Sequence, residues 1–277
     1  MFLLVLEPLP VHAAAGIVQQ NNGGCEACAS TTLSIPFLAS VASGDVIVAG
    51  VMAGAGFSGG TVMSVSDTLG SSFTQAVMAL NSVSGAVHIY YAVLSSSGSD
   101  TVSVTFTSTT DYQNMYVYEV SGVLATPAGT ASGYSPGGAP SAAISTSTSV
   151  TFQAGAFLLG VMATDGSVGI ASVGPNFQLS SDKSGTVIIG QGAEWSTSGV
   201  SSPTDFPMSL SASTDWAEVG IALNPTAAVG GTAAVGGRML SIDPFMVLMS
   251  WLILILTLAA TVVGAFLIRR RMNHYRH

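Results

Sequence analysis

The chain has 277 residues, of which 48% are hydrophobic and only 7% are charged, and its formal net charge is −8. Disordered chains combine low hydrophobicity with high net charge, so this composition argues against general disorder. Lys183 is the only basic residue before Arg238, whereas twelve acids lie between Glu26 and Glu218. Nucleic-acid backbones are bound by clustered Lys and Arg, so we expect no nucleic-acid partner.

The first residues, MFLLVLEPLPVHAAAG, carry part of a secretory signal, with an apolar run followed by small residues. A complete signal has a basic start and an uninterrupted apolar run. Here no basic residue precedes the run, and Glu7 interrupts it. We interpret 1–15 as an atypical signal peptide whose start is missing or misassigned; a first β-strand is the alternative.

Residues 16–225 alternate apolar and polar side chains with a period of two, which is typical of half-buried strands. Turn residues (Gly, Pro, Asp and Ser) separate the alternating runs. The pattern predicts an all-β ectodomain, a two-sheet jelly-roll-like sandwich. The clearest runs are TVSVTFT at 101–107, VHIYYAV at 87–93, MYVYEV at 115–120 and AEVGIAL at 217–223, and the apolar runs at 45–53 and 156–164 indicate central strands.

Two of the apolar runs resemble each other: SGDVIVAGVMA at 43–53 and AGAFLLGVMAT at 154–164. They indicate either two small Ig-like domains or two matching strands of one domain. We favour one domain, because each half alone offers few strands to close a sandwich.

The C-terminal part of the chain predicts a membrane anchor. Residues 226–243 begin with the repeat TAAVGGTAAVGG and form a flexible linker. The segment 244–268 contains no charged residue and is long enough to cross a bilayer as one helix. The tail 269–277 begins with three arginines, which are expected to stay in the cytoplasm. The prediction is a single-pass cell-membrane protein with an extracellular N-terminal domain. A sorting signal is the alternative, but no LPxTG-like motif precedes the helix.

Five segments in order resemble a known kind of sequence: GDVIVAGVMA, SVSDTLGSSFTQAV, VHIYYAVLSSSGSDTVSVTFTS, MYVYEVSGV and WAEVGIALNP. They are similar to the β-sandwich (jelly-roll or Ig-like) modules of bacterial and archaeal cell-surface proteins. The resemblance spans about residues 31–225. It implies a role in surface display as stalk, adhesin or carbohydrate-facing domain, and it assigns no catalytic residues.

Cys25 and Cys28 form a CEAC motif near the start of the ectodomain. Outside the cytoplasm two cysteines usually pair, so we predict a local disulfide. The alternatives are an intermolecular bridge or free thiol, or a redox or metal site. A redox site needs a βαβ context, and a zinc site needs about four ligands.

Trp195 and Trp216 are the strongest hints of ligand binding. Exposed aromatic rings flank sugar sites because a ring stacks on apolar C–H faces, and exposed apolar patches mark interaction sites. Trp216 alternates with apolar residues that face inward, and Trp195 lies in a loop-like stretch, GAEWSTSG. The alternative is that both rings are buried at the edge of the sandwich.

Glu119 stands in an otherwise apolar strand and raises the question of acid–base catalysis. A glycosidase needs two carboxylates at a set separation. Asp111, Glu194 and Glu218 are candidates for the second, but nothing in the sequence brings them close to Glu119. A structural role for Glu119 is the simpler interpretation. Six aspartates at turns offer scattered oxygens, so we expect no cofactor, with a single calcium site as the alternative.

These observations favour a non-enzymatic surface protein with an adhesive, structural or glycan-contacting role, whose partners are the membrane and glycans or other surface proteins. One alternative is a membrane-tethered carbohydrate-active enzyme on a concanavalin-like sandwich. Another is a self-associating filament subunit, in which residues 17–41 would complete the sheet of a neighbour.

Overall fold

The computed structural model describes residues 14–53, 62–81, 85–135, 140–183 and 189–227. Within these ranges all regular secondary structure is β-strand, which confirms the predicted all-β class. The described part of the chain contains no helix of the length and apolarity that a membrane crossing requires. Residues 1–13 of the predicted signal peptide 1–15 lie outside the described residues, as does the whole predicted span 244–268.

The strands form three antiparallel sheets, where two were expected. A six-stranded sheet has the order β1-β6-β2-β5-β4, with β3 paired to β6; a five-stranded sheet has the order β11-β12-β9-β14-β7; a three-stranded sheet has the order β10-β13-β8. The bounds are β1 (Gly16–Pro36), β2 (Val46–Ala53), β3 (Val62–Asp67), β4 (Thr74–Asn81), β5 (Gly85–Val93), β6 (Thr101–Ser121), β7 (Gly129–Tyr134), β8 (Ser141–Ile144), β9 (Phe157–Asp165), β10 (Ile170–Val173), β11 (Gln178–Lys183), β12 (Ile189–Ser196), β13 (Met208–Thr214) and β14 (Trp216–Leu223).

The strands β1–β6, here called the N-terminal half, enclose a core of their own. The first part of β6 pairs with β3 and with the end of β1, whereas its last part pairs with β2 and with the start of β1. Side chains from the first part of β6, such as Val104 and Phe106, pack against side chains from β2, such as Ile47 and Val51. The long sheet therefore folds over its own face, because β6 and β1 each pass from one layer to the other.

The strands β7–β14, here called the C-terminal half, have the same arrangement in two separate sheets. The outer face of β9 and β14 is covered by β8, β10 and β13. Buried side chains of this layer include Ile144, Met208 and Leu210, which pack around Met162 and Trp216. In the sequence pattern of residues 217–223, one face of the strand is apolar and the other is not. The second face is therefore also buried, because this further layer covers it.

The two halves repeat one topology. The order β1-β6-β2-β5-β4 corresponds strand for strand to β7-β14-β9-β12-β11, and the outer layer of β3, β6 and β1 corresponds to β10, β13 and β8. The same glycine turn precedes the central strand of each half, with Gly44 at φ 92° and Gly155 at φ 80°. These glycines occupy matching places in the two similar runs at 43–53 and 154–164, so that similarity marks equivalent strands of a duplicated unit.

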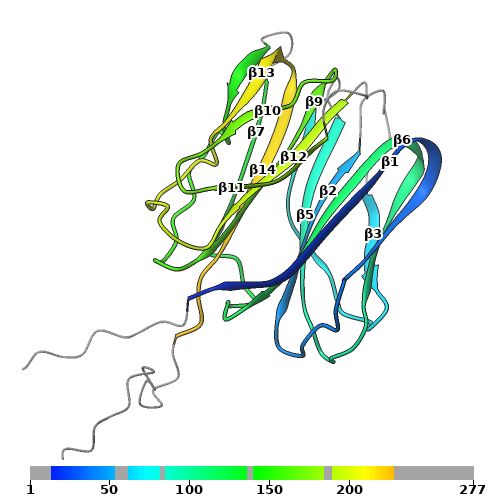
Figure 1. Ribbon diagram of the computed structural model, residues 1–277, viewed down its shortest axis with the longest axis vertical. Helices are drawn as coiled ribbons and strands as arrows, with labels where there is room; N and C mark the ends of the chain where they lie inside the picture. Colours follow the sequence, from blue (N-terminus) through cyan, green and yellow to red (C-terminus); the bar gives the residue numbers. More distant parts are fainter. Residues whose placement is uncertain (1–13, 54–61, 82–84, 136–139, 184–188, 228–277) are drawn as a thin grey trace, which may run out of the picture. The chain divides into compact units, whose positions relative to one another are not determined.

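The halves pack face to face through a central core (Figure 1). Strand β2 lies against β9, β5 against β9 and β14, β4 against β14 and β7, and β6 against β12. Gly50 lies at the centre, where any side chain would come within 2.6 Å of Val161 Cγ2. The absence of a side chain at Gly50 lets the two central strands approach each other.

Residues 16–36, which include most of the segment considered as a donor strand, are paired with β6 of the same chain. The two ends of the described region also meet. Gly16 pairs with Ser121, and Thr226 donates its N–H to the carbonyl of Gly122 at 2.8 Å. The chain therefore enters and leaves the folded region at the junction between its halves.

Candidate functional site

The two tryptophans lie in strands and not in loops. Trp216 is only 8% exposed and packs among Met162, Ile170 and Leu210 in the C-terminal half, which agrees with the alternative of a buried ring. The outer layer of the C-terminal half covers it. Trp195 lies in β12, is partly buried, and packs against the central core. Glycan contact by either ring remains a prediction.

The cysteine motif and one of the turn aspartates take part in interactions that stabilise the fold. Cys25 is disulfide-bonded, and Cys28 is the only other cysteine of the chain. Asp100 accepts hydrogen bonds from the backbone N–H and the hydroxyl of Thr68, at 3.1 and 2.8 Å, and thereby holds the turn before β6. Among the described residues no group of three or more His, Cys, Asp or Glu side chains is placed to hold a metal ion.

Glu119 has no exposed surface and is held by hydrogen bonds. Its carboxylate accepts from Gln19 Nε2 at 2.7 Å and from the N–H of Ala42 at 2.6 Å. These bonds tie the start of β1 and the turn before β2 to the end of β6. The geometry fits the structural interpretation of Glu119, because a buried carboxylate is stable when its oxygens have donors.

Two other carboxyl groups, on Glu194 and Glu218, lie in the core of the C-terminal half. Glu194 in β12 pairs with Gly160 and Glu218 in β14 pairs with Met162, so the two groups flank β9 on one face of the sheet. Both residues have no exposed surface. A side chain at Gly160 would meet Glu194 Cγ at 3.1 Å and Phe206 Cδ1 at 3.2 Å, so the side chain of Glu194 and the ring of Phe206 both lie close to this glycine.

Burial sets the protonation of this pair. It raises the pKa of Glu194 to about 8, although a hydrogen bond from the N–H of Gly174 at 3.0 Å opposes the rise. It raises the pKa of Glu218 well above its usual value, and the nearby Glu194 and Asp205 add to the rise. Neither oxygen of Glu218 has a hydrogen-bond partner in the structure. Glu194 is therefore mostly protonated at neutral pH, and burial favours the neutral form of Glu218 as well.

His88 is another buried titratable group. It is 1% exposed, its ring stacks on Tyr90 with centroids 6.1 Å apart, and burial lowers its pKa to about 4. It is neutral at pH 7 and contributes a packed ring rather than a charge.

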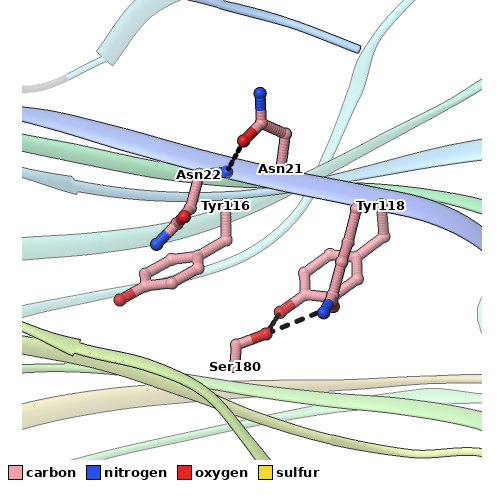
Figure 2. A pocket seen from close by; sticks show the side chains of 6 residues that line it. Asn21, Asn22, Tyr116, Tyr118 and Ser180 are labelled. Atoms are coloured by element: carbon pink, nitrogen blue, oxygen red, sulfur yellow. Dashed lines mark hydrogen bonds between the residues drawn. The ribbon is translucent and has the colours of Figure 1, made fainter. Parts of the chain in front are cut away.

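A polar hollow, here called the seam pocket, lies between the two halves. Figure 2 shows Tyr118 of β6 pointing to Ser180 of β11 on the opposite sheet, with Tyr116 of β6 and Asn22 of β1 beside it in the lining. Period-two alternation places Gln20 on the same face of β1 as Asn22, and the register sets these two beside Tyr118 and Tyr116. The pocket has a volume of about 110 Å³ and is lined by Gln20, Asn21, Asn22, Tyr116, Tyr118 and Ser180.

The seam pocket is built from neutral hydrogen-bonding groups. Tyr118 Oη hydrogen-bonds with Ser180 Oγ, which donates to Gln20 Oε1 at 3.4 Å. Asn114 Nδ2 donates to Tyr116 Oη at 3.4 Å from a position with no exposed surface. Burial raises the pKa of Tyr118, so its hydroxyl stays protonated. The two tyrosines are 1% exposed, which fixes their hydroxyls, while the amides of β1 border the opening.

The groups of the seam pocket can form hydrogen bonds to a ligand. No side chain that lines the seam pocket carries a charge. The volume is that of about three or four water molecules, or of one hydroxyl-bearing part of a larger ligand. Amide and hydroxyl groups can donate to and accept from such hydroxyls.

The sequence analysis did not identify the seam pocket, and it offered Glu194 and Glu218 only as candidate partners of Glu119, whereas the structure places them on either side of β9. The seam pocket joins residues of β1, β6 and β11, which are far apart in the chain. One signal was available: Gln20 and Asn22 alternate with a period of two, as Tyr116 and Tyr118 do, and this places polar groups on one face of each strand. For the pair, the signal was two glutamates within apolar strands, but which strand lies between them follows only from the topology.

Comparison with known proteins gives no match, since no family model, curated protein or solved structure shows significant similarity to this chain.

Proposed function

We propose that this chain is a membrane-anchored cell-surface protein without enzymatic activity, whose jelly-roll-like ectodomain contacts neutral glycans through the seam pocket. In this proposal residues 1–15 direct secretion, 244–268 anchor the chain, and 16–225 form a display module like those of bacterial and archaeal surface proteins.

The observation that carries the proposal is the contrast between the seam pocket and the carboxyl pair. A glycosidase needs two carboxyls that reach the sugar, one of them ionised. Glu194 and Glu218 have no exposed surface. The seam pocket instead opens to solvent and presents neutral amide and hydroxyl groups. A neutral, hydroxyl-rich partner suits such a lining, because every polar group of the pocket can hydrogen-bond to a hydroxyl.

Surface display is tested on intact cells that express the full chain with a different epitope at each end. Protease added outside is expected to remove the N-terminal epitope and leave the C-terminal one. Protection of both epitopes would refute an extracellular ectodomain.

Glycan contact is tested by screening the full chain on a glycan array, with and without calcium. We expect binding to neutral glycans that Asn22→Ala or Tyr118→Phe weakens at least tenfold. Ser209→Ala is the matched control, because Ser209 is an exposed serine on β13, away from the seam pocket. Binding that survives both pocket variants, or no binding at all, would refute glycan contact at this pocket and favour a purely structural role.

A further inference from the structure

The duplicated topology identifies a pair of equivalent aromatic residues. Thr74 of β4 pairs with Tyr91 of β5, and Gln178 of β11 pairs with Trp195 of β12 in the corresponding place of the C-terminal half. Both rings are partly buried, and both pack against the central core.

The turns before β4 and β11 are equivalent as well. The N-terminal half reads LGSSFT at 69–74 and the C-terminal half reads VGPNFQ at 173–178, with Gly and Phe at matching places. Ser72 therefore corresponds to Asn176, and Ser95, beyond β5, corresponds to Gly199, beyond β12.

The C-terminal turn is closed by its asparagine. Asn176 adopts a left-handed backbone with φ 65°, and its Nδ2 donates to the carbonyl of Gly199 at 2.7 Å. A side chain at Gly199 would come within 3.2 Å of Asn176 Cγ. The amide thus bridges the turn to the segment after β12.

In the N-terminal half Ser72 stands in place of Asn176, and its side chain is too short to bridge the turn to Ser95. A groove of about 360 Å³, here called the Tyr91 groove, is lined by Gly70, Ser71, Ser72, Thr74, Tyr91, Ala92, Val93 and Ser95. Its volume lies within the range of small-molecule sites, about 300–1,000 Å³. It is separate from the seam pocket and shares no lining residue with it.

The lining defines the chemistry of the ligand. Tyr91 supplies an aromatic ring, and Val93, which is 41% exposed, extends the apolar floor. Four hydroxyl side chains surround this floor, and no charged side chain lines the groove: the hydroxyls belong to Ser71, Ser72, Thr74 and Ser95. A charged ligand would lose its hydration without gaining a counter-charge. A pyranose ring has an apolar C–H face for the aromatic ring and hydroxyls at its rim for the serines and threonine.

We propose that the Tyr91 groove binds a neutral pyranose unit, stacked on Tyr91 and hydrogen-bonded at its rim by Ser72, Thr74 and Ser95. This site stands apart from the seam pocket, and it does not depend on the function proposed for that pocket.

The test uses the full chain in micelles of a detergent without a sugar headgroup. Saturation-transfer NMR measures contact with glucose, galactose, mannose, N-acetylglucosamine and their β-linked disaccharides. We expect transfer to the ring protons of at least one of these sugars. Ser72→Asn, which installs the closing amide of the C-terminal half, is expected to weaken binding at least tenfold, as is Tyr91→Ala. Tyr91→Phe keeps the ring and is expected to retain most of the affinity.

Each outcome decides the question. Ser72 is exposed, so we expect the Ser72→Asn variant to fold. Its thermal midpoint, compared with that of the wild type, checks the fold. The test therefore does not depend on Tyr91→Ala, which removes a partly buried ring. Absence of transfer from every probe sugar would overturn the proposal. Binding that Ser72→Asn leaves intact but Tyr118→Phe abolishes would also overturn it, and would place the sugar in the seam pocket instead.

Discussion

Replacing Glu194 by glutamine is expected to stabilise the fold at pH 8 while changing it little at pH 4. The wild-type carboxyl is buried, and burial raises its pKa from 4.5 to about 8. The folded state therefore keeps a proton that the unfolded chain releases between these two values. Stability is fully present below pH 4.5 and is lost as the pH rises toward 8. Glutamine has the same shape and does not ionise.

The size of the effect follows from the change in pKa. Each pH unit across the window contributes about 1.36 kcal/mol, so ionisation of Glu194 is worth on the order of 5 kcal/mol in total. Domains are typically stable by about 5–15 kcal/mol, so the loss is a large fraction of the whole. For a domain of roughly 200 residues, it corresponds to a fall of about 10–20 °C in the thermal midpoint. Glu218, whose pKa is also raised, adds to the fall.

Thermal unfolding followed by circular dichroism from pH 4 to pH 9 checks the prediction. The midpoint of the wild type is expected to fall between pH 4.5 and pH 8, and that of Glu194→Gln to fall less. Glu119→Gln is the control: its carboxylate has donors on both oxygens, so we expect the amide to lower the midpoint at neutral pH. A wild-type midpoint that is flat or rising across this window would refute the reasoning, as would an equal gain from Glu194→Gln at every pH.

Three further substitutions test the packing of the two halves and the cysteine motif. Gly50→Val places its Cβ 2.6 Å from Val161 Cγ2 and is expected to cost about 1–3 kcal/mol in urea unfolding; Val161→Ala in the same chain is expected to restore most of this, and purely additive effects would contradict the contact. Phe206→Ala removes a ring with no exposed surface and is expected to cost about 3–5 kcal/mol; a loss below about 1 kcal/mol would argue against the burial of this ring. Cys25→Ser opens only a short local loop, so we expect a loss of at most about 2 kcal/mol, measured as the shift in thermal midpoint relative to wild type with and without reductant. A larger loss would indicate that the bridge constrains more than its own loop.

The strands could be predicted because their signal is local. Period-two alternation at 87–93 and 217–223 and the apolar runs at 45–53 and 156–164 each correspond to a strand of the structure. The apolar runs became β2 and β9, the central strands of the two sheets that face each other. The runs at 101–107 and 115–120 proved to be parts of one strand, β6, because the turn-like residues between them continue the pairing with β1.

The third layer could not be predicted in the same way. Trp216 alternates with residues that face the central core. Alternation shows that the two faces of a strand differ in polarity, but it does not show that the more polar face contacts solvent. The face of Trp216 and Glu218 is covered by β8, β10 and β13, which are short and weakly patterned. The duplication was visible in part, through the runs at 43–53 and 154–164. The matching turns at 69–74 and 173–178 extend it, and their one decisive difference, Ser72 against Asn176, acquires meaning only once the register is known.

The meeting of the chain ends at the junction of the halves makes the order of the halves interchangeable. Gly16 pairs with Ser121, and Thr226 bonds to Gly122, so a short peptide could join the two ends. A circular permutant opened between Leu124 and Gly129 would then begin with the C-terminal half and end with the N-terminal one. Every strand pairing would be kept, since none depends on which half is made first.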